Sequence, residues 1–446
     1  MEEYLKVLVE QIRCKKARPY ICQEFKEHLE DQIATNISEG MDHESAEKAA
    51  VKDMGDPVET GISLDRIHKP QVAWKMLLLI GVISVVGIVI HWLINMQVEG
   101  ADAYVSGKYP IHVALGIIVM MVLYFIDYTV LARFSKLIAG VLLASCIYTM
   151  FFGIQINGMR AWMMMAGIPI SIQAVMLLYV PVYGGVIYKY RGLGYKGLLK
   201  SIVWAILPVV LVLRIQSLIT ACMLLISMLV MLTIAVQKDW FVIKKRAAIV
   251  GVWTGFIALP IIGLVVMYFG NILAEYQKAR IQAFLLNSGD ENYLTTTVRS
   301  FLKINKMIGD SGVDISGSLP GFNTDYILVY LSSAYGTIVS ILVGCVLAVL
   351  IFMIWGTALK QKNQLGMLMG SGCGMIFLVS FAINVLENMG AFPPTMTFLP
   401  FFSAGGSYIV VSYGMLGIVL SIYRYKNIHP RHVKTNVPRI KMTIEL

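Results

Sequence analysis

The sequence predicts an all-α polytopic membrane protein of about ten transmembrane helices, with both termini in the cytoplasm and a small cytoplasmic helical domain at the N-terminus. Of its 446 residues 57% are hydrophobic and 14% are charged, whereas soluble domains carry about 25% charged residues. Apolar runs of the length that a bilayer requires recur after Val72. The formal charge of +10 does not indicate nucleic-acid binding, because residues 1–75 carry a net −4 and the remainder +14.

Residues 1–70 are predicted to form the cytoplasmic helical domain. Apolar residues recur there at helical spacing, and the run after Gly40 is typical of a capped helix that ends at Gly55-Asp56-Pro57. The segment EFKEHLEDQI, followed by Glu-Lys-Ala-Ala and Gly-Asp-Pro, resembles the short "permease prefix" domain of some bacterial membrane proteins. The alternative is a plain cytoplasmic bundle without a ligand.

The membrane domain is predicted over residues 71–425. The apolar runs lie near residues 72–95, 111–132, 137–155, 168–188, 198–213, 217–236, 247–271, 324–357, 366–390 and 404–423. Pro208 and Arg214 indicate that the fifth run ends at a membrane surface. Asp127, near the inner end of the second run, could reach Arg133.

The distribution of Lys and Arg predicts the orientation. Loops after the even-numbered runs, together with the basic C-terminal stretch that begins at Arg424 and continues through the tail at 426–446, hold 18 of these residues, whereas the short loops of the other side hold only Lys108, Arg160 and Arg214. Both termini are therefore expected inside, and the long segment 271–323 outside. That segment contains amphipathic, basic stretches, which favour helices lying in the membrane surface. The alternative is a lid that covers the outer ends of the spans.

Asp325 is the acid that the sequence singles out. It follows Asn323 and Thr324, which are good helix N-cap residues, and is expected in the first turn of the long eighth helix. An acid there gains about 0.3–1 kcal/mol from the helix dipole without any catalysis. The residue types alone therefore leave capping and chemistry both open.

Four stretches resemble the SEDS family (shape, elongation, division and sporulation; the RodA/FtsW/SpoVE type). They are NGMRAW at 157–162, YQKARIQAFL at 276–285, LPGFNTDYILVYLSSAYG at 319–336 and FPPTMTFLPFFSAGGSY at 392–408. Their order, spacing and predicted membrane side agree with the family over about 350 residues.

The resemblance implies a peptidoglycan glycosyltransferase of the bacterial cytoplasmic membrane that polymerises lipid II, an undecaprenyl-linked substrate, beside a class B penicillin-binding protein. It makes Asp325 the catalytic residue, and a positioned carboxylate suits a general base for the attacking sugar hydroxyl. The departing diphosphate requires cations, for which Arg160, Arg280, Arg299 and Lys303 are available. A divalent metal ion, Mg²⁺ or Mn²⁺, could share this task, although no carboxylate cluster or cysteine spacing requires one.

Further substrate contacts are expected from the same stretches. They are Trp162, Thr324, Ser403, Gly405, Gly406 and Ser407. Arg160 and Trp162 could instead form an interfacial anchor, and the two glycines could serve a close backbone approach in a re-entrant loop. Asn384, Glu387 and Asn388 are typical of interhelical hydrogen bonds.

The chain also departs from the family pattern. The family's Arg before Trp162 is Ala161 here, with Arg160 one position away, and its Glu pair after the catalytic segment is Ser332 and Ser333. Two alternatives to the enzyme therefore stay open. One is a non-catalytic paralogue that acts as a scaffold or regulator of wall synthesis, and the other is a flippase for the lipid-linked precursor.

Overall fold

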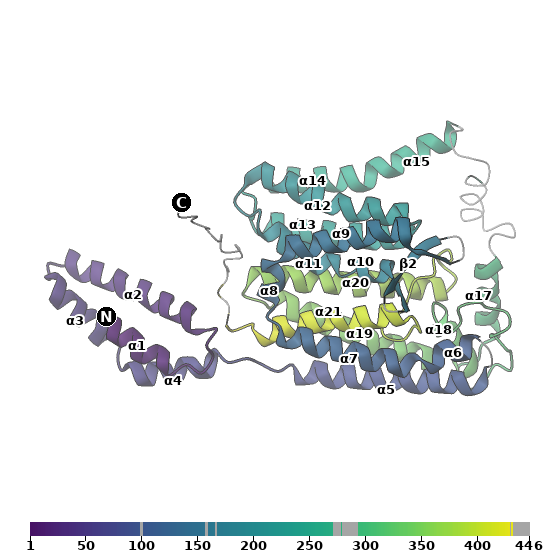
Figure 1. Cartoon of the computed structure of the whole chain (residues 1–446), viewed down its shortest axis with the longest axis horizontal. Helices are drawn as coiled ribbons and strands as arrows, with labels where there is room; N and C mark the ends of the chain where they lie inside the picture. The colour runs from purple at the N-terminus through teal and green to yellow at the C-terminus, as the bar shows by residue number, and fades with distance from the viewer. Residues whose placement is uncertain are drawn as a thin grey trace, which may run out of the picture.

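The computed structural model describes residues 1–98, 101–156, 159–165, 167–270, 278, 293–428 and 430. The N-terminal helices lie beyond one end of a larger bundle of helices (Figure 1). We call the end of the bundle next to these helices the proximal end. The opposite end, where α6 (Ala101–Gly107), β2 (Met159–Met165), α17 (Tyr293–Ile304) and α18 (Ile327–Ala334) lie, is the distal end (Figure 1).

The N-terminal unit consists of four helices, as the sequence predicts. They are α1 (Glu2–Glu10), α2 (Arg18–Ser38), α3 (His43–Asp53) and α4 (Pro57–Ile67). Asp42 caps α3 by accepting a hydrogen bond from the Ser45 amide at 3.1 Å, and Asp56 caps α4 through the Val58 amide at 3.0 Å. The predicted helix ends near Gly40 and Gly55 are thus confirmed.

Nine helical stretches in the described part of the chain are long and apolar enough to cross a membrane. They are α5 (Trp74–Gln97), α6 (Ala101–Gly107) with α7 (Tyr109–Phe125), α9 (Ser135–Phe152), α12 (Gly194–Arg214), α13 (Leu218–Gln237), the succession α14 (Lys245–Trp253), η1 (Thr254–Ala258) and α15 (Leu259–Phe269), α19 (Thr337–Leu359), α20 (Gln364–Asn388) and α21 (Gly406–Arg424). The expected fourth span is a shorter, broken pair, α10 (Ile172–Met176) and α11 (Tyr179–Tyr188). The all-α polytopic class is confirmed, and α12 ends at Arg214 as predicted.

Helices α20 and α21 form the centre of the bundle. In each of them, 72% of an apolar 18-residue stretch is buried inside the protein. The corresponding share for the succession from α14 to α15 is 6%, and this succession lies at the edge of the bundle (Figure 1). Helix α20 packs against α11, α13 and α19, and α21 packs along the whole of α7. Both central helices therefore extend through the interior of the bundle to the distal end.

The prediction of one continuous eighth helix over 324–357 is wrong. The structure has a short helix, α18 (Ile327–Ala334), then a break, then α19. Gly336 makes the break with a φ of +104°, and a Cβ there would lie 2.7 Å from the Met307 carbonyl oxygen. The chain that follows α17 (Tyr293–Ile304) crosses the break, with the Thr337 amide donating to Lys306 O at 3.0 Å. Asp325 therefore precedes a short helix instead of lying in the first turn of a long one.

The second span also ends earlier than expected. Helix α7 stops at Phe125, and α8 (Tyr128–Arg133) is a separate helix that Asp127 caps through the Thr129 amide at 3.0 Å. The Asp127 carboxylate pairs with Lys16 Nζ of the N-terminal unit at 3.1 Å. A partner from the N-terminal unit was not anticipated from the sequence.

The segment after α9 folds as a small antiparallel sheet at the distal end. Its strands are β1 (Ile154–Ile156), β2 (Met159–Met165) and β3 (Ile168–Ser171), in that spatial order. The start of the expected span at 168 is therefore strand, because residues 168–171 pair with β2. The sheet lies beside the start of α21, where the Ser171 amide donates to Ser407 Oγ at 3.0 Å.

Candidate functional site

Asp325 lies at the distal end, on a tight turn that begins at Gly321. The Gly321 carbonyl accepts hydrogen bonds from the amides of Thr324 and Tyr326, both at 3.0 Å. Gly321 has a φ of +77°, and Asp325 Oδ2 would lie 3.6 Å from a Cβ at that position. The turn thus requires glycine for its backbone conformation and places the carboxylate beside it.

Two asparagines of α20 hold the main chain of this turn. The side-chain amides of Asn384 and Asn388 each donate to the Asp325 carbonyl oxygen at 2.8 Å. Asn388 Oδ1 also accepts from the Val329 amide at 3.1 Å. Both asparagines are buried. The predicted interhelical hydrogen bond is present for Asn388, which accepts from Val329 of α18, whereas Asn384 binds residues outside the helices.

The loop before α21 holds the turn from a second side. Ser403 Oγ donates to the Thr324 carbonyl at 2.7 Å and accepts from the Leu399 amide at 2.6 Å. The Ala404 amide donates to Asn323 O at 3.2 Å. Ser403 is 2% exposed, and its hydrogen bonds brace the turn. The expected contact between Ser403 and the substrate stays a prediction.

A third set of contacts comes from α5 and α6. Asn323 Nδ2 donates to Ser106 Oγ at 3.2 Å, and Ser106 contacts His91 Nδ1 at 3.4 Å. His91 Nε2 lies 2.7 Å from the Phe402 carbonyl oxygen, and its ring stacks on Tyr109. Sequence reasoning missed His91 and Ser106, although an ionisable residue within an apolar span is a signal for closer inspection.

The electrostatics of Asp325 follow from this enclosure. The protein around the carboxylate raises its pKa to about 7, chiefly by desolvation and secondarily by the charge of Glu387 on α20. A hydrogen bond with Thr324 acts in the opposite direction. The residue keeps a partly exposed face. A carboxylate with this pKa is protonated and deprotonated near neutral pH, as a general base must be.

Arg160 and Trp162 lie on β2, where Arg160 is exposed and Trp162 is partly buried. The intervening residue, Ala161, is fully buried. Ala161 is the extra residue of a bulge, because Gln155 pairs with Arg160 and Ile154 pairs with Trp162. That Arg160 supplies a guanidinium one position away stays a prediction.

The remaining predicted cations differ in their surroundings. Arg299 Nε donates to the Gly390 carbonyl at 2.9 Å, just beyond the C-terminal end of α20. Lys303 lies one turn further along α17 and is exposed. Arg280 lies outside the described residues. Lys303 is thus available for an anion, and Arg299 already stabilises a helix end.

Gly405, Gly406 and Ser407 lie at the start of α21, next to the loop that carries Ser403. A Cβ at Gly406 would lie 2.7 Å from His112 Nε2. The imidazole of His112, on α7, therefore packs directly on this glycine. Ser407 Oγ accepts from the Ser171 amide. These contacts support the close backbone approach expected at the glycines.

The described residues contain no group of three His, Cys, Asp or Glu side chains that could hold a metal ion. Asp325 and Glu387 are the neighbouring carboxylates at the distal end, and both Glu387 oxygens accept hydrogen bonds from residues 395–397. The binding of a Mg²⁺ or Mn²⁺ ion stays a prediction.

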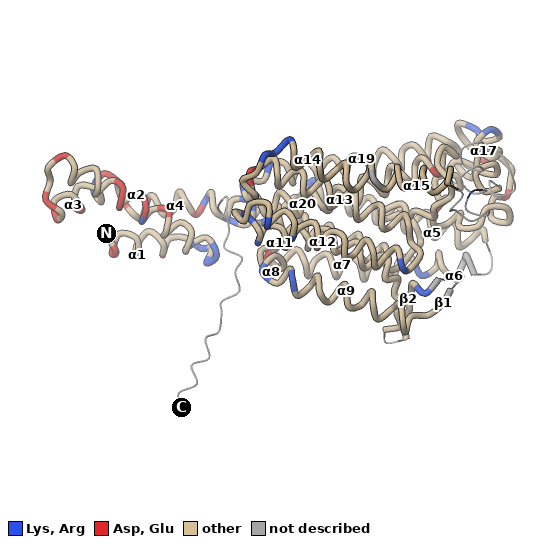
Figure 2. Tube along the Cα trace, turned by 90° about the horizontal axis from the view of Figure 1, so that it is seen from above, with Lys and Arg blue, Asp and Glu red and all other residues tan. Residues whose placement is uncertain are grey.

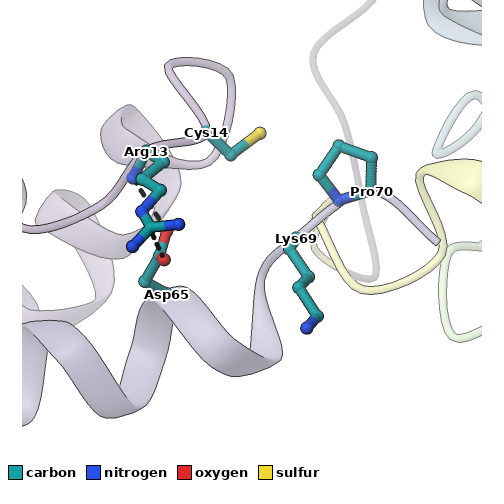
Figure 3. A pocket seen from close by; sticks show the side chains of 5 residues that line it. All are labelled: Arg13, Cys14, Asp65, Lys69 and Pro70. Carbon is teal, nitrogen blue, oxygen red and sulfur yellow. Dashed lines mark hydrogen bonds and ion pairs between the residues drawn. The ribbon is translucent and has the colours of Figure 1, made fainter.

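A pocket in the N-terminal unit has different chemistry. It has a volume of about 330 Å³ and is lined by Arg13, Cys14, Asp65, Lys69 and Pro70 (Figure 3). The Arg13 amide donates to Asp65 Oδ1 at 2.8 Å. The pocket lies where the N-terminal unit joins α5, at the opposite end of the molecule from Asp325 (Figure 1).

The fold and this braced acid define a class: a polytopic membrane protein whose distal loops hold the turn that carries Asp325. Residues 70–428 match the FtsW/RodA/SpoVE family, described as "Cell cycle protein". The chain belongs to this family, and the resemblance seen in the sequence is confirmed.

Individual relatives agree. An FtsW protein of Enterococcus hirae is 26% identical over 68% of this chain and 79% of its own length. The MrdB protein of Helicobacter pylori, named a peptidoglycan glycosyltransferase, is 23% identical over 74% of this chain and 85% of its own.

Solved structures show the same fold. A chain of a peptidoglycan synthase complex superposes with a TM-score of 0.64 at 20% identity, over 79% of this chain and 98% of that one. RodA of Thermus thermophilus superposes with a TM-score of 0.54 at 17% identity, over 80% of this chain and 97% of its own.

Proposed function

We propose that this protein is a membrane peptidoglycan glycosyltransferase that polymerises lipid II, with Asp325 as the general base. The observation that carries the proposal is a partly exposed carboxylate with a pKa near 7, held on a turn braced from three sides. Family membership and relatives named as peptidoglycan glycosyltransferases support it.

In the proposed reaction, a sugar hydroxyl of one substrate attacks the anomeric carbon of the other. A new bond forms between the hydroxyl oxygen and that carbon, and the bond from the carbon to the diphosphate oxygen breaks. Asp325 accepts the hydroxyl proton, and the undecaprenyl diphosphate leaves as an anion. A general base in this role contributes about 10²–10⁴-fold to the rate. The exposed Lys303 and Arg160 are the described candidates to attract the anion.

We infer the membrane orientation from charge. Figure 2 shows Lys and Arg gathered at the proximal end of the bundle, around α8, α11 and α14. The positive-inside rule then places the proximal end, with both termini, in the cytoplasm. The distal end, with Asp325, faces outward from the bacterial cytoplasmic membrane. A class B penicillin-binding protein is the expected partner there, in keeping with the similarity to a chain of a peptidoglycan synthase complex.

The decisive experiment incubates the purified full chain with lipid II and measures glycan polymer. Wild type is expected to form polymer, and Asp325→Asn is expected to lose at least about 100-fold in rate. Asp314→Asn is the matched control, because this exposed acid lies in the same loop region and binds only its neighbour Ser316 among the contacts described. Equal rates for wild type and Asp325→Asn would exclude the base role.

A scaffold or regulator without catalysis is the second candidate. The buried Ala161 and the uncharged Ser332 and Ser333 favour it, since these positions lack family charges. It predicts that Asp325→Asn rescues a null strain as fully as wild type does. A flippase predicts movement of labelled lipid II across vesicles without polymer, and no observation here favours it specifically.

A further inference from the structure

Glu387 is a buried acid close to Asp325 that the proposed reaction does not yet use. It lies on α20 between Asn384 and Asn388 and is 2% exposed. The spacing of three and four residues places all three side chains on one face of the helix. That face meets the turn of Asp325 through the two asparagines.

The Glu387 carboxylate organises the loop opposite Asp325. Oε1 accepts from the amides of Thr395 at 2.7 Å and Met396 at 2.9 Å, and Oε2 accepts from Thr395 Oγ1 at 3.2 Å and the Thr397 amide at 3.3 Å. The Tyr326 hydroxyl lies beside this carboxylate. One side chain therefore orders the loop at 395–397 next to the residue that follows Asp325.

Among the residues that the structure describes, the charge of Glu387 is not offset by a salt bridge. Within the described part of the chain, no ion pair reaches Glu387 or Asp325. Three backbone amides and the Thr395 hydroxyl donate to Glu387 and favour its charged form, against the cost of burying that charge. A negative charge at this place repels a second negative charge on Asp325.

We propose that Glu387 is a positioning residue of the reaction, which shapes the loop facing Asp325 and makes the Asp325 carboxylate a stronger base through its own charge. This inference rests on the proposed function and deepens it. The raised pKa of Asp325, with Glu387 as its second cause after burial, agrees with the geometry. The other groups that face the two acids are Tyr326, Thr324 and Tyr408 of α21, and Arg299 binds the carbonyl of Gly390 just beyond α20.

Ser332 and Ser333 of α18, where the sequence resemblance implies a Glu pair, are buried and bind Asn305 and Ser311, respectively. The carboxylate described beside Asp325 is that of Glu387 on α20.

The test compares the pH dependence of lipid II polymerisation in wild type and Glu387→Gln. Removal of the charge is expected to lower the midpoint of the acidic limb by roughly one pH unit and to reduce the maximal rate. Thr395→Val is the matched control, since it removes one hydrogen bond to Glu387 and keeps the charge. It is expected to reduce the rate equally at every pH.

Glu387→Asp keeps the charge on a shorter side chain and is expected to keep the wild-type midpoint with a reduced rate. Glu387→Met is a second charge-removing variant for the case that Glu387→Gln does not fold. A midpoint that stays at the wild-type value in the folded charge-removing variant would overturn the proposal.

A second readout is independent of activity. The infrared carbonyl band of protonated Asp325, identified by its loss in Asp325→Asn, is titrated in wild type and in Glu387→Gln. The proposal expects the Asp325 band to disappear at a lower pH in the variant, and coincident titrations contradict it. If wild type makes no polymer at any pH, the proposed function fails, and this titration still decides the role of Glu387.

Discussion

At the scale of single residues, Asp325 shows how a fold adjusts an ordinary carboxylate. An exposed Asp has a pKa near 4 and is a weak base at neutral pH. Burial and the neighbouring Glu387 raise the pKa of Asp325 to about 7. The same position keeps the residue partly exposed, so a substrate hydroxyl can reach it.

The first prediction is a pH profile. If Asp325 acts as the base, it must be deprotonated, so polymerisation should rise about tenfold per pH unit below a midpoint near 7 and level off above it. Rates of lipid II consumption between pH 5 and 9, measured under single-turnover conditions, check this. A profile that is flat across that range contradicts the base role.

The second prediction concerns stability. The folded-state pKa of Asp325 lies above its unfolded value of 3.8, so its contribution to stability is fully present below that value and is lost as the pH rises through about 7. Asp325→Asn should therefore raise the melting temperature relative to wild type at pH 8 but not at pH 4. Thermal unfolding in detergent at both pH values measures it, with Asp314→Asn as the exposed control.

The third prediction tests the asparagine brace. Asn388→Ala removes a 2.8 Å hydrogen bond to the Asp325 carbonyl and another to the Val329 amide. Each lost partner of a buried group costs about 1–3 kcal/mol. The kcat for lipid II should fall about tenfold or more with a smaller change in KM. Asn384→Ala should act in the same direction, and the double variant should cost less than the sum. A rise in KM with an unchanged kcat would refute positioning.

At the scale of elements, the break between α18 and α19 decides where Asp325 lies. A continuous helix would place residues 319–326 one or more turns away from α20. The break instead lets the chain after α17 cross at Gly336 and hydrogen-bond to Tyr335 and Thr337. Apolar composition alone does not reveal this break, because the residues on both sides suit a membrane helix.

The fourth prediction follows from this crossing. Gly336→Ala places a methyl group 2.7 Å from Met307 O and 2.8 Å from Ile308 Cα, at a φ of +104° that side chains rarely adopt. The variant should lose folded yield and melt several degrees lower. Gly140→Ala is the control, since a Cβ at that position in α9 meets nothing within 4 Å. Equal melting temperatures for Gly336→Ala and wild type would contradict the expectation.

At the scale of the whole molecule, the N-terminal unit is attached to the proximal end of the α7–α21 pair. Lys16 Nζ lies 3.1 Å from Asp127 Oδ2 and 3.3 Å from the Tyr425 hydroxyl, and it lies over the Tyr425 ring. His68 Nδ1 lies 2.6 Å from the Asn427 carbonyl. Helices α7 and α21 connect this contact to Gly406 and the loop that braces Asp325.

The fifth prediction tests this attachment. Lys16→Ala leaves Asp127, which is 4% exposed, with a buried charge and without its ion-pair partner from the N-terminal unit. Hydrogen exchange should increase in the linker at 68–73 and in α8. Lys15→Ala, at the exposed neighbouring position, should leave exchange unchanged. Unchanged exchange in Lys16→Ala would show that the unit is held without this pair.

Much of the fold follows from local pattern. The nine long spans lie near predicted apolar runs, and the caps at Asp42 and Asp56 lie where Gly and Pro end the preceding helices. The sheet at 154–171 was missed, because a short apolar run does not distinguish strand from membrane helix. The site was predicted only at Asp325 and its motif neighbours. His91, Ser106 and the role of Glu387 depend on residues distant in sequence.

The sequence by itself determined that this is a membrane protein of the FtsW/RodA/SpoVE family and that Asp325 is its leading candidate for chemistry. Hydrophobic length and charge distribution are local properties, and a motif is read residue by residue. The tertiary structure decided which groups surround Asp325. Asn384, Glu387, Asn388 and Ser403 follow it by about 60 to 80 positions, and only packing of α20 and the loop before α21 against one turn brings them within hydrogen-bond distance.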